Sequence, residues 1–118
     1  MIDIKPFIAE KLKDIAKVEL SFHNNFSVLP VIVMTETVNE AHIVINNSDR
    51  VSRITVQLDI YSETAKKTEE TAQRVNEVMT AGGFYRSFSE LITDEEKPRR
   101  CIRYTCGVDE AAGRILAL

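Results

Sequence analysis

Strict alternation of apolar and polar side chains between residues 53 and 60 constrains the fold of this 118-residue chain more than any other feature. The apolar positions are Ile54, Val56, Leu58 and Ile60, and the polar positions are Arg53, Thr55, Gln57 and Asp59. Successive side chains of a strand point to opposite faces, so the pattern predicts a strand with one dry face and one wet face. The fold must therefore contain a sheet whose apolar face is covered by other elements.

Further strands are predicted over residues 18–23, 28–35, 41–45, 84–92 and 99–108, where apolar residues alternate with polar ones or β-branched residues cluster. Residues 36–40 are expected to join two of these strands. The sequence Asn46-Asn47-Ser48-Asp49 predicts a turn, because Asn and Asp tolerate left-handed backbone.

The last two predicted strands should form a hairpin around the polar loop 93–98. Simple alternation along the first of them places Phe84, Arg86 and Phe88 on one face. An arginine among apolar neighbours must reach past them or be paired, and we expect Arg86 to be paired.

Two amphipathic patterns predict helices over residues 4–17 and 64–81. Asp3 is the best available N-cap for the first helix, and Ser62 or Thr64 can cap the second. Gly82-Gly83 predicts the end of the second helix, because a residue without a Cβ is favoured there. Residues 111–118 are expected to form a short helical turn or a tail.

Together these elements predict an α+β fold in the order α-β-β-β-β-α-β-β. Short links between successive strands favour antiparallel pairing, so we expect a mainly antiparallel sheet with both helices packed on its dry face, a two-layer sandwich. The length suits a single domain over residues 1–118, and an apolar content of 44% supplies its core without a disulfide or a metal.

Charge and hydropathy exclude several classes of partner. The net charge of −3 does not attract a polyanion, so we expect no specific nucleic-acid binding. The longest apolar stretch, residues 28–34, is far shorter than the roughly twenty residues that cross a bilayer, so no membrane partner is expected. No signal peptide is expected at the N-terminus either, because Asp3 stands where such a peptide is basic and no apolar run follows.

Residues able to carry chemistry are few and dispersed. His23 and His42 lie in strand-like segments without a nucleophile or carboxylate at a catalytic spacing, which favours a surface role. Cys101 and Cys106 lack the spacing of a zinc site and should point to opposite faces of a strand, as free thiols in a reducing compartment. The sequence therefore predicts a protein that is not an enzyme and that needs no cofactor or metal.

Arginines are concentrated in the predicted closing hairpin. They are Arg86, Arg99, Arg100 and Arg103. Three consecutive acids, Asp94, Glu95 and Glu96, lie in the loop between the strands. We expect the arginines to pair with these acids or with an acidic neighbouring subunit, since the domain is acidic overall. A second, weaker candidate contact is the loop that contains Asn47, Asp49 and Arg50.

The order of several segments resembles the tail terminator family of long-tailed bacteriophages, also called tail completion or tail-to-head joining proteins and common in prophages of low-GC Gram-positive bacteria. The segments are the strand ITVQLDIYS at 54–62, a charged helix ending in Val78-Met79-Thr80, the segment GGFYRSFS at 82–89, an acidic loop, and Cys101-Ile102-Arg103-Tyr104. The resemblance covers about residues 4–108, and the short, very acidic 93–98 loop departs from the family pattern.

This resemblance implies a structural virion protein without enzymatic activity. Its subunits would form a ring, six-fold to match the tail tube, that stops tail growth and forms the head–tail joining interface. The implied partners are further copies of the chain, the tail tube protein, and the head connector or stopper protein. The implied location is the head–tail junction of the virion, after assembly in the cytoplasm of the bacterial host.

Alternatives from other classes remain open from the sequence. A head-completion or connector-stopper protein of the same phage module would differ only in its binding partner. A small nucleic-acid-binding domain would show affinity that falls steeply with salt, and a small hydrolase would need a pocket with a perturbed acid or histidine. If the arginines form subunit contacts, charge reversal at Arg100 should block tail completion and leave the circular-dichroism spectrum unchanged.

Overall fold

The structure is a computed structural model that describes residues 2–20, 28–45, 48–93 and 97–116. The elements in chain order are α1 (Lys5–Leu12), β1 (Lys17–Glu19), β2 (Val31–Ile45), β3 (Ser48–Tyr61), α2 (Ala65–Ala81), β4 (Tyr85–Ile92), β5 (Arg99–Asp109) and β6 (Arg114–Leu116). The described part of the chain is therefore an α+β fold with two helices, as predicted.

The six strands of the described residues belong to one sheet, in the order β1-β2-β3-β5-β4 with β6 paired to β5. Only β1 and β2 are parallel among the paired strands described, so the sheet is mainly antiparallel, as predicted. On β5, pairing with β4 covers residues 99–105 and pairing with β6 covers residues 107–109. β4 and β6 thus follow one another along the same edge of the sheet.

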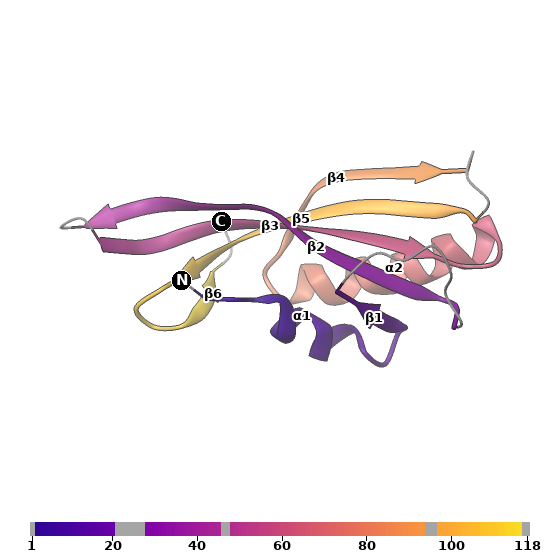
Figure 1. Cartoon of the computed structure of the whole chain (residues 1–118), viewed down its shortest axis with the longest axis horizontal. Helices are drawn as coiled ribbons and strands as arrows, with labels where there is room; N and C mark the ends of the chain where they lie inside the picture. The colour runs from indigo at the N-terminus through magenta and orange to yellow at the C-terminus, as the bar shows by residue number, and fades with distance from the viewer. Residues whose placement is uncertain (1, 21–27, 46–47, 94–96, 117–118) are drawn as a thin grey trace.

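The alternation in β3 places its apolar side chains in the core, as predicted. The inward residues of β3 and β5 share this core with residues of both helices; they include Ile54, Val56, Leu58, Ile60, Ile102, Tyr104, Cys106, Ile8, Leu12, Ala72, Val75 and Met79. Figure 1 shows α1 and α2 below the sheet, with the strands passing above them. We call the sheet face that the helices leave uncovered the outer face.

The ends of α2 follow from local chemistry. Thr64 is the N-cap, and its Oγ1 accepts a hydrogen bond from the backbone N–H of Lys67 at 3.1 Å. Gly82 is the C-cap, and Gly83 follows with a φ of 93°, a conformation that a side chain disfavours. Both predicted ends of this helix are confirmed.

The first helix is shorter than the predicted span 4–17. α1 ends at Leu12, and residues 13–15 form a turn in which the N–H groups of Ile15 and Ala16 donate to the Leu12 carbonyl at 3.0 and 3.3 Å. This turn reverses the chain into β1, which a longer helix would prevent. Asp3 lies one residue before the N-cap, and its carboxylate accepts a hydrogen bond from the Lys5 N–H at 3.0 Å.

The strands predicted at 28–35 and 41–45 are a single strand, β2. Residues 36–40, expected to be a link, continue its pairing with β3. The pairing register shifts between Glu36 and Val38 and again beyond Ala41. These shifts let the strand continue where the alternation of apolar and polar residues is broken, which is why the sequence predicted two strands. β3 begins at Ser48, so Ser48 and Asp49 of the predicted 46–49 turn belong to this strand instead, and residues 46 and 47 lie outside the described residues.

The long β2–β3 hairpin makes the molecule elongated, with extents of 50 × 25 × 24 Å. Its outer part, residues 38–45 of β2 and 48–53 of β3, projects beyond the helices in Figure 1, and we call it the arm. The β5–β6 hairpin lies beside the root of the arm (Figure 1). Of residues 111–118, predicted as a short helical turn or a tail, 111–113 form a turn and Arg114–Leu116 form β6, while 117 and 118 lie outside the described residues.

Candidate functional site

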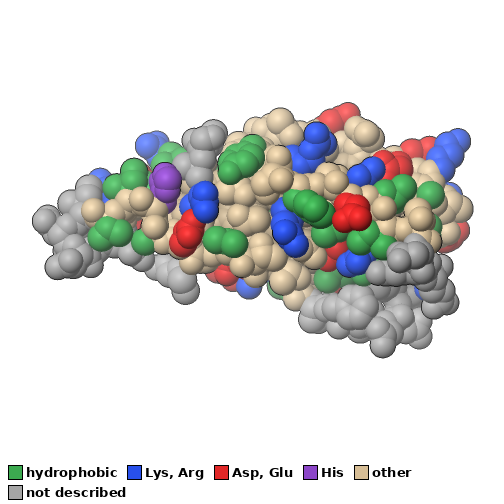
Figure 2. All heavy atoms as spheres, turned by 90° about the horizontal axis from the view of Figure 1, so that it is seen from above, with side chains coloured by type: hydrophobic (Ala, Val, Ile, Leu, Met, Phe, Trp, Pro, Cys, Tyr) green, Lys and Arg blue, Asp and Glu red, His purple; other side chains and the backbone are tan. Residues whose placement is uncertain are grey.

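The outer face of the sheet brings together two of the predicted site residues, Arg99 and Arg103. The strand registers place Val38, Thr55, Thr105 and Tyr85 in one row across β2, β3, β5 and β4. The next row towards the other end of the sheet consists of Thr35, Gln57, Arg103 and Phe88. Figure 2 views this face, where hydrophobic side chains are scattered among charged and other polar groups.

Asp59 is the centre of a hydrogen-bond network on the outer face. Its side chain is only 9% exposed, and its two oxygens accept from Arg99 at 3.2 Å and from the Gln57 amide at 2.9 Å. Gln57 in turn accepts from the Arg103 Nε at 3.1 Å. The network therefore ties β3 to β5 and fixes the directions of two of the arginines predicted to form contacts.

Arg103 also lies over the ring of Phe88 on β4, with 4.9 Å between the guanidinium carbon and the ring centroid. In the adjoining row the hydroxyl groups of Thr55 and Thr105 are 2.8 Å apart. Short polar side chains thus link three neighbouring strands across the outer face. These links restrict the side chains of the outer face to defined positions.

A β-bulge in β4 overturns the predicted parity of this strand. The register shifts between Arg86 and Phe88, so that Ser87 is the extra residue. Phe84 is buried in the core, Arg86 pairs with Tyr104 in register, and Phe88 is on the outer face with Arg103. Arg86 therefore lies on the helix side of the sheet, and no ion pair joins it to another described residue.

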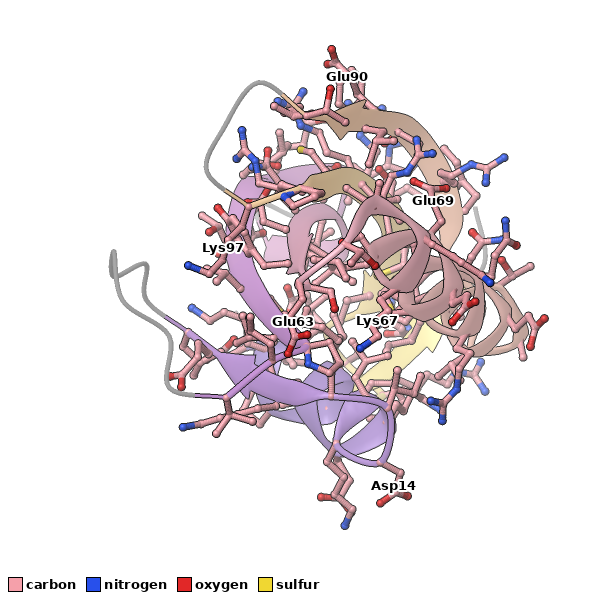
Figure 3. The ribbon with its side chains drawn as sticks, turned by 90° about the vertical axis from the view of Figure 1, so that its right-hand side faces the viewer. Asp14, Glu63, Lys67, Glu69, Glu90 and Lys97 are labelled. Carbon is pink, nitrogen blue, oxygen red and sulfur yellow. The ribbon has the colours of Figure 1, made fainter. Side chains whose placement is uncertain are left out.

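Arg100 is held by α2 instead of facing a partner. Its Nε and Nη2 donate to the two carboxylate oxygens of Glu69 at 3.0 and 2.8 Å, and its Nη1 donates to the Ser89 hydroxyl at 3.1 Å. Figure 3 shows Glu69 between α2 and the strands, whereas Glu90 points away from the helices. Both side chains of the Arg100–Glu69 pair are partly buried, so this pair is a structural contact between helix and sheet.

The other predicted site residues are placed as follows. Asp94, Glu95, Glu96 and Asn47 lie outside the described residues. Asp49 belongs to β3, and Arg50 is exposed on the arm. The arm also exposes apolar side chains, with Val38, Ile43 and Val44 39, 47 and 55% exposed. His42 is exposed on the arm, and His23 is outside the described part of the chain.

Two buried thiols and a buried phenol have raised pKa values. Burial raises the pKa of the Cys106 thiol to about 11, and burial with the nearby Asp59 carboxylate raises that of Cys101 to about 11. Burial likewise raises the pKa of Tyr104 to about 12. Cys106 belongs to the core, and Cys101 pairs in register with Asp59 of the outer face. The two free thiols therefore point to opposite faces, as predicted.

A metal centre does not emerge from the described side chains. Among residues 2–20, 28–45, 48–93 and 97–116, no three His, Cys, Asp or Glu residues group closely enough to hold an ion. No helix within these ranges is long and apolar enough to cross a membrane.

The partners of the arginines are what sequence reasoning missed. Asp59 was identified only as a wet-face residue of its strand, and Glu69 only as one of many charges on a helix. Part of the signal for Asp59 was available, because an acid in mid-strand favours a cationic partner on a neighbouring strand, although the sequence did not indicate that the arginine-rich strand is that neighbour. No comparable pattern indicates Glu69, whose contact depends on how α2 crosses the sheet.

Comparison of the chain with protein-family models and with curated proteins finds no match in either.

Proposed function

We propose that this chain is a structural protein that assembles with copies of itself into a ring, as a tail terminator at the end of a phage tail tube. The observation that carries the proposal is the arm, which projects from the body and exposes Val38, Ile43 and Val44. A projecting hairpin with apolar side chains on its surface is costly for an isolated subunit and suits a contact with a neighbour.

The edges of the sheet support a head-to-tail contact. Within the described residues, β2 is covered on its far side only by β1 at residues 31–33, and β4 pairs only with β5. The two open edges differ in sequence, so a contact of one with the other is heterologous. Repeated heterologous contacts close into a ring when the rotation between subunits divides a full turn.

We also propose a two-layer packing, in which both helices cover the same face of the sheet. With both helices on one face, the outer face and the arm stay available to neighbouring subunits or to the tail tube. The ring size proposed from the family resemblance is six. The virion head–tail junction is the proposed location, with the tail tube protein and the head connector as partners.

The decisive experiment is electron microscopy of the purified protein mixed with polymerised tail tubes. We expect density at one end of each tube and arrest of further tube growth.

Val44→Asp on the arm should abolish this binding, because it places a charge in the contact. Leu20→Asp is the matched control, since Leu20 is also exposed, at 58%, but lies outside the arm. Tubes that stay uncapped, or equal effects of the two variants, would contradict the proposal.

Arg100 is a poor probe of this assembly. The Arg100 guanidinium is hydrogen-bonded to the Glu69 carboxylate. Replacing Arg100 by an acidic residue would therefore place two carboxylates next to each other. The variant should lose stability whether or not it assembles, so the arm variants replace it as the test.

A connector-stopper protein of the same module is the second candidate, and the same arm supports it. Its partner would be the portal complex instead of the tail tube. Mixing the protein with each assembly in parallel distinguishes the two functions, since the proposed tail terminator must cap the tube.

A further inference from the structure

The groove between α2 and β4 offers more hydrogen-bond donors than acceptors. It has a volume of about 490 Å³, and its polar lining includes Glu69, Gln73 and Asn76 of α2 and Arg86, Ser89 and Arg100 of the sheet. Ala72 and Ile102 add an apolar part to the lining. Some of these groups already form hydrogen bonds or ion pairs within the chain.

Arg100 and Glu69 neutralise each other. Their two parallel hydrogen bonds use both carboxylate oxygens, and the remaining Nη1 of Arg100 is bonded to Ser89. This pair therefore leaves no net charge in the groove. Arg86 is the remaining cation of the lining, and within the described residues no ion pair balances it.

Asn76 has its amide direction fixed by a buried tyrosine. The Tyr104 hydroxyl donates to the Asn76 Oδ1 at 2.9 Å, and Tyr104 is completely buried. A phenol with a raised pKa keeps its proton at neutral pH, so it stays a donor to this oxygen. Since Oδ1 is occupied, the free group of the Asn76 amide is its Nδ2 donor. Asn76 and Arg86 thus both contribute unused donors to the same groove.

We propose that this groove binds the carboxylate of an aspartate or glutamate side chain on an extended segment of a partner protein. Arg86 supplies the charge and a planar pair of donors, and the Asn76 Nδ2 supplies a further donor. Ala72 and Ile102 accept the methylene groups next to the carboxylate. The open edge of β4 lies beside the groove, so the backbone of the segment can add to the sheet while its acidic side chain enters. This binding does not depend on ring formation.

The test is a titration of the full ¹⁵N-labelled chain with a capped Ala-Glu-Ala peptide, followed through the side-chain resonances of Asn76 and Arg86. We expect saturable shifts of both resonances. Arg86→Gln should weaken binding at least about tenfold by removing the charge. Asn76→Asp should do so too, because it keeps an acceptor for Tyr104 and replaces the Nδ2 donor by an oxygen. Arg74→Gln is the matched control, since Arg74 is exposed on α2 outside the groove.

Two further titrations test the assignment of the ligand. A capped Ala-Gln-Ala peptide should not shift these resonances, and inorganic phosphate should bind more weakly than the glutamate peptide. Equal binding of the glutamine peptide, tighter binding of phosphate, or unchanged affinity in Arg86→Gln would overturn the proposal. Failure to cap tail tubes would refute the ring proposal and leave the peptide result unchanged, so the two outcomes are distinguishable.

Discussion

The arginines of β5 are used in three different ways, although they are close in sequence. Arg99 pairs with Asp59 of β3, Arg100 with Glu69 of α2, and Arg103 lies over Phe88 of β4. Together these side chains join β5 to β3, to α2 and to β4, because Arg103 also donates to Gln57 of β3 and Arg100 to Ser89 of β4. A cluster that suggested an intermolecular surface from the sequence is largely an internal set of links.

The Arg100–Glu69 pair should contribute measurably to stability. We expect Glu69→Gln to lower the free energy of unfolding by about 1 kcal/mol, because a partly buried guanidinium loses its charged, bidentate partner. Glu63→Gln is the matched control, since the Lys67–Glu63 pair is exposed and its charged atoms are 3.6 Å apart. Glu63→Gln should lower the free energy of unfolding by less than about 0.5 kcal/mol. Urea denaturation of both variants checks this, and equal losses would contradict it.

The buried cysteines should make the protein less stable in alkali. As pH rises from about 9 to about 11, unfolded thiols ionise while Cys101 and Cys106 stay protonated in the folded state. The folded state then binds more protons, so the free energy of unfolding falls with rising pH. The double variant Cys101→Ala/Cys106→Ala should show a shallower fall in this window. Urea denaturation at a series of pH values measures both slopes, and parallel slopes would disprove the explanation.

At the level of secondary structure, the elements with uniform local signals were predictable. α2 has an amphipathic stripe and marked ends, and β5 and the second half of β3 alternate regularly, so the sequence alone locates these parts, whereas it missed the start of β3 at Ser48. The extent of β2 was not predictable, because bulges break its alternation and pairing with β3 overrides the local pattern. The same reason applies to β4, where the extra residue Ser87 turns Arg86 and Phe88 to opposite faces.

The end of α2 offers a test of its backbone geometry. Gly83 has a φ of 93°, so Gly83→Ala should lower the free energy of unfolding by about 1 kcal/mol. Gly82→Ala should cost less, because Gly82 has a φ of −82° that any residue adopts. Thermal unfolding of the two variants gives the comparison, and the reverse ranking would show that the left-handed backbone is not what requires glycine at this position.

The shape of the whole molecule is set by the arm. The radius of gyration of the Cα atoms is 15.0 Å, whereas a compact domain of this length has about 13.5 Å. Small-angle X-ray scattering of a dilute sample should therefore give a pair-distance distribution that ends near 50 Å. A more concentrated sample should show larger distances if the chains associate. If the maximum distance in the dilute sample is instead close to the diameter of a compact sphere of the same mass, the arm does not project.

The strands of the arm are the same strands that run through the core. β3 pairs with β5 from Val51 to Tyr61 without a register shift, so this strand continues unbroken from the arm into the core, whereas the register shifts of β2 against β3 lie between Glu36 and Val44. A load applied at the tip would be carried as shear along the whole ladder of backbone hydrogen bonds, which break together rather than one at a time. The subunit should therefore resist pulling through its arm far better than peeling from the β4 edge, a mechanical asymmetry that single-molecule force spectroscopy can measure.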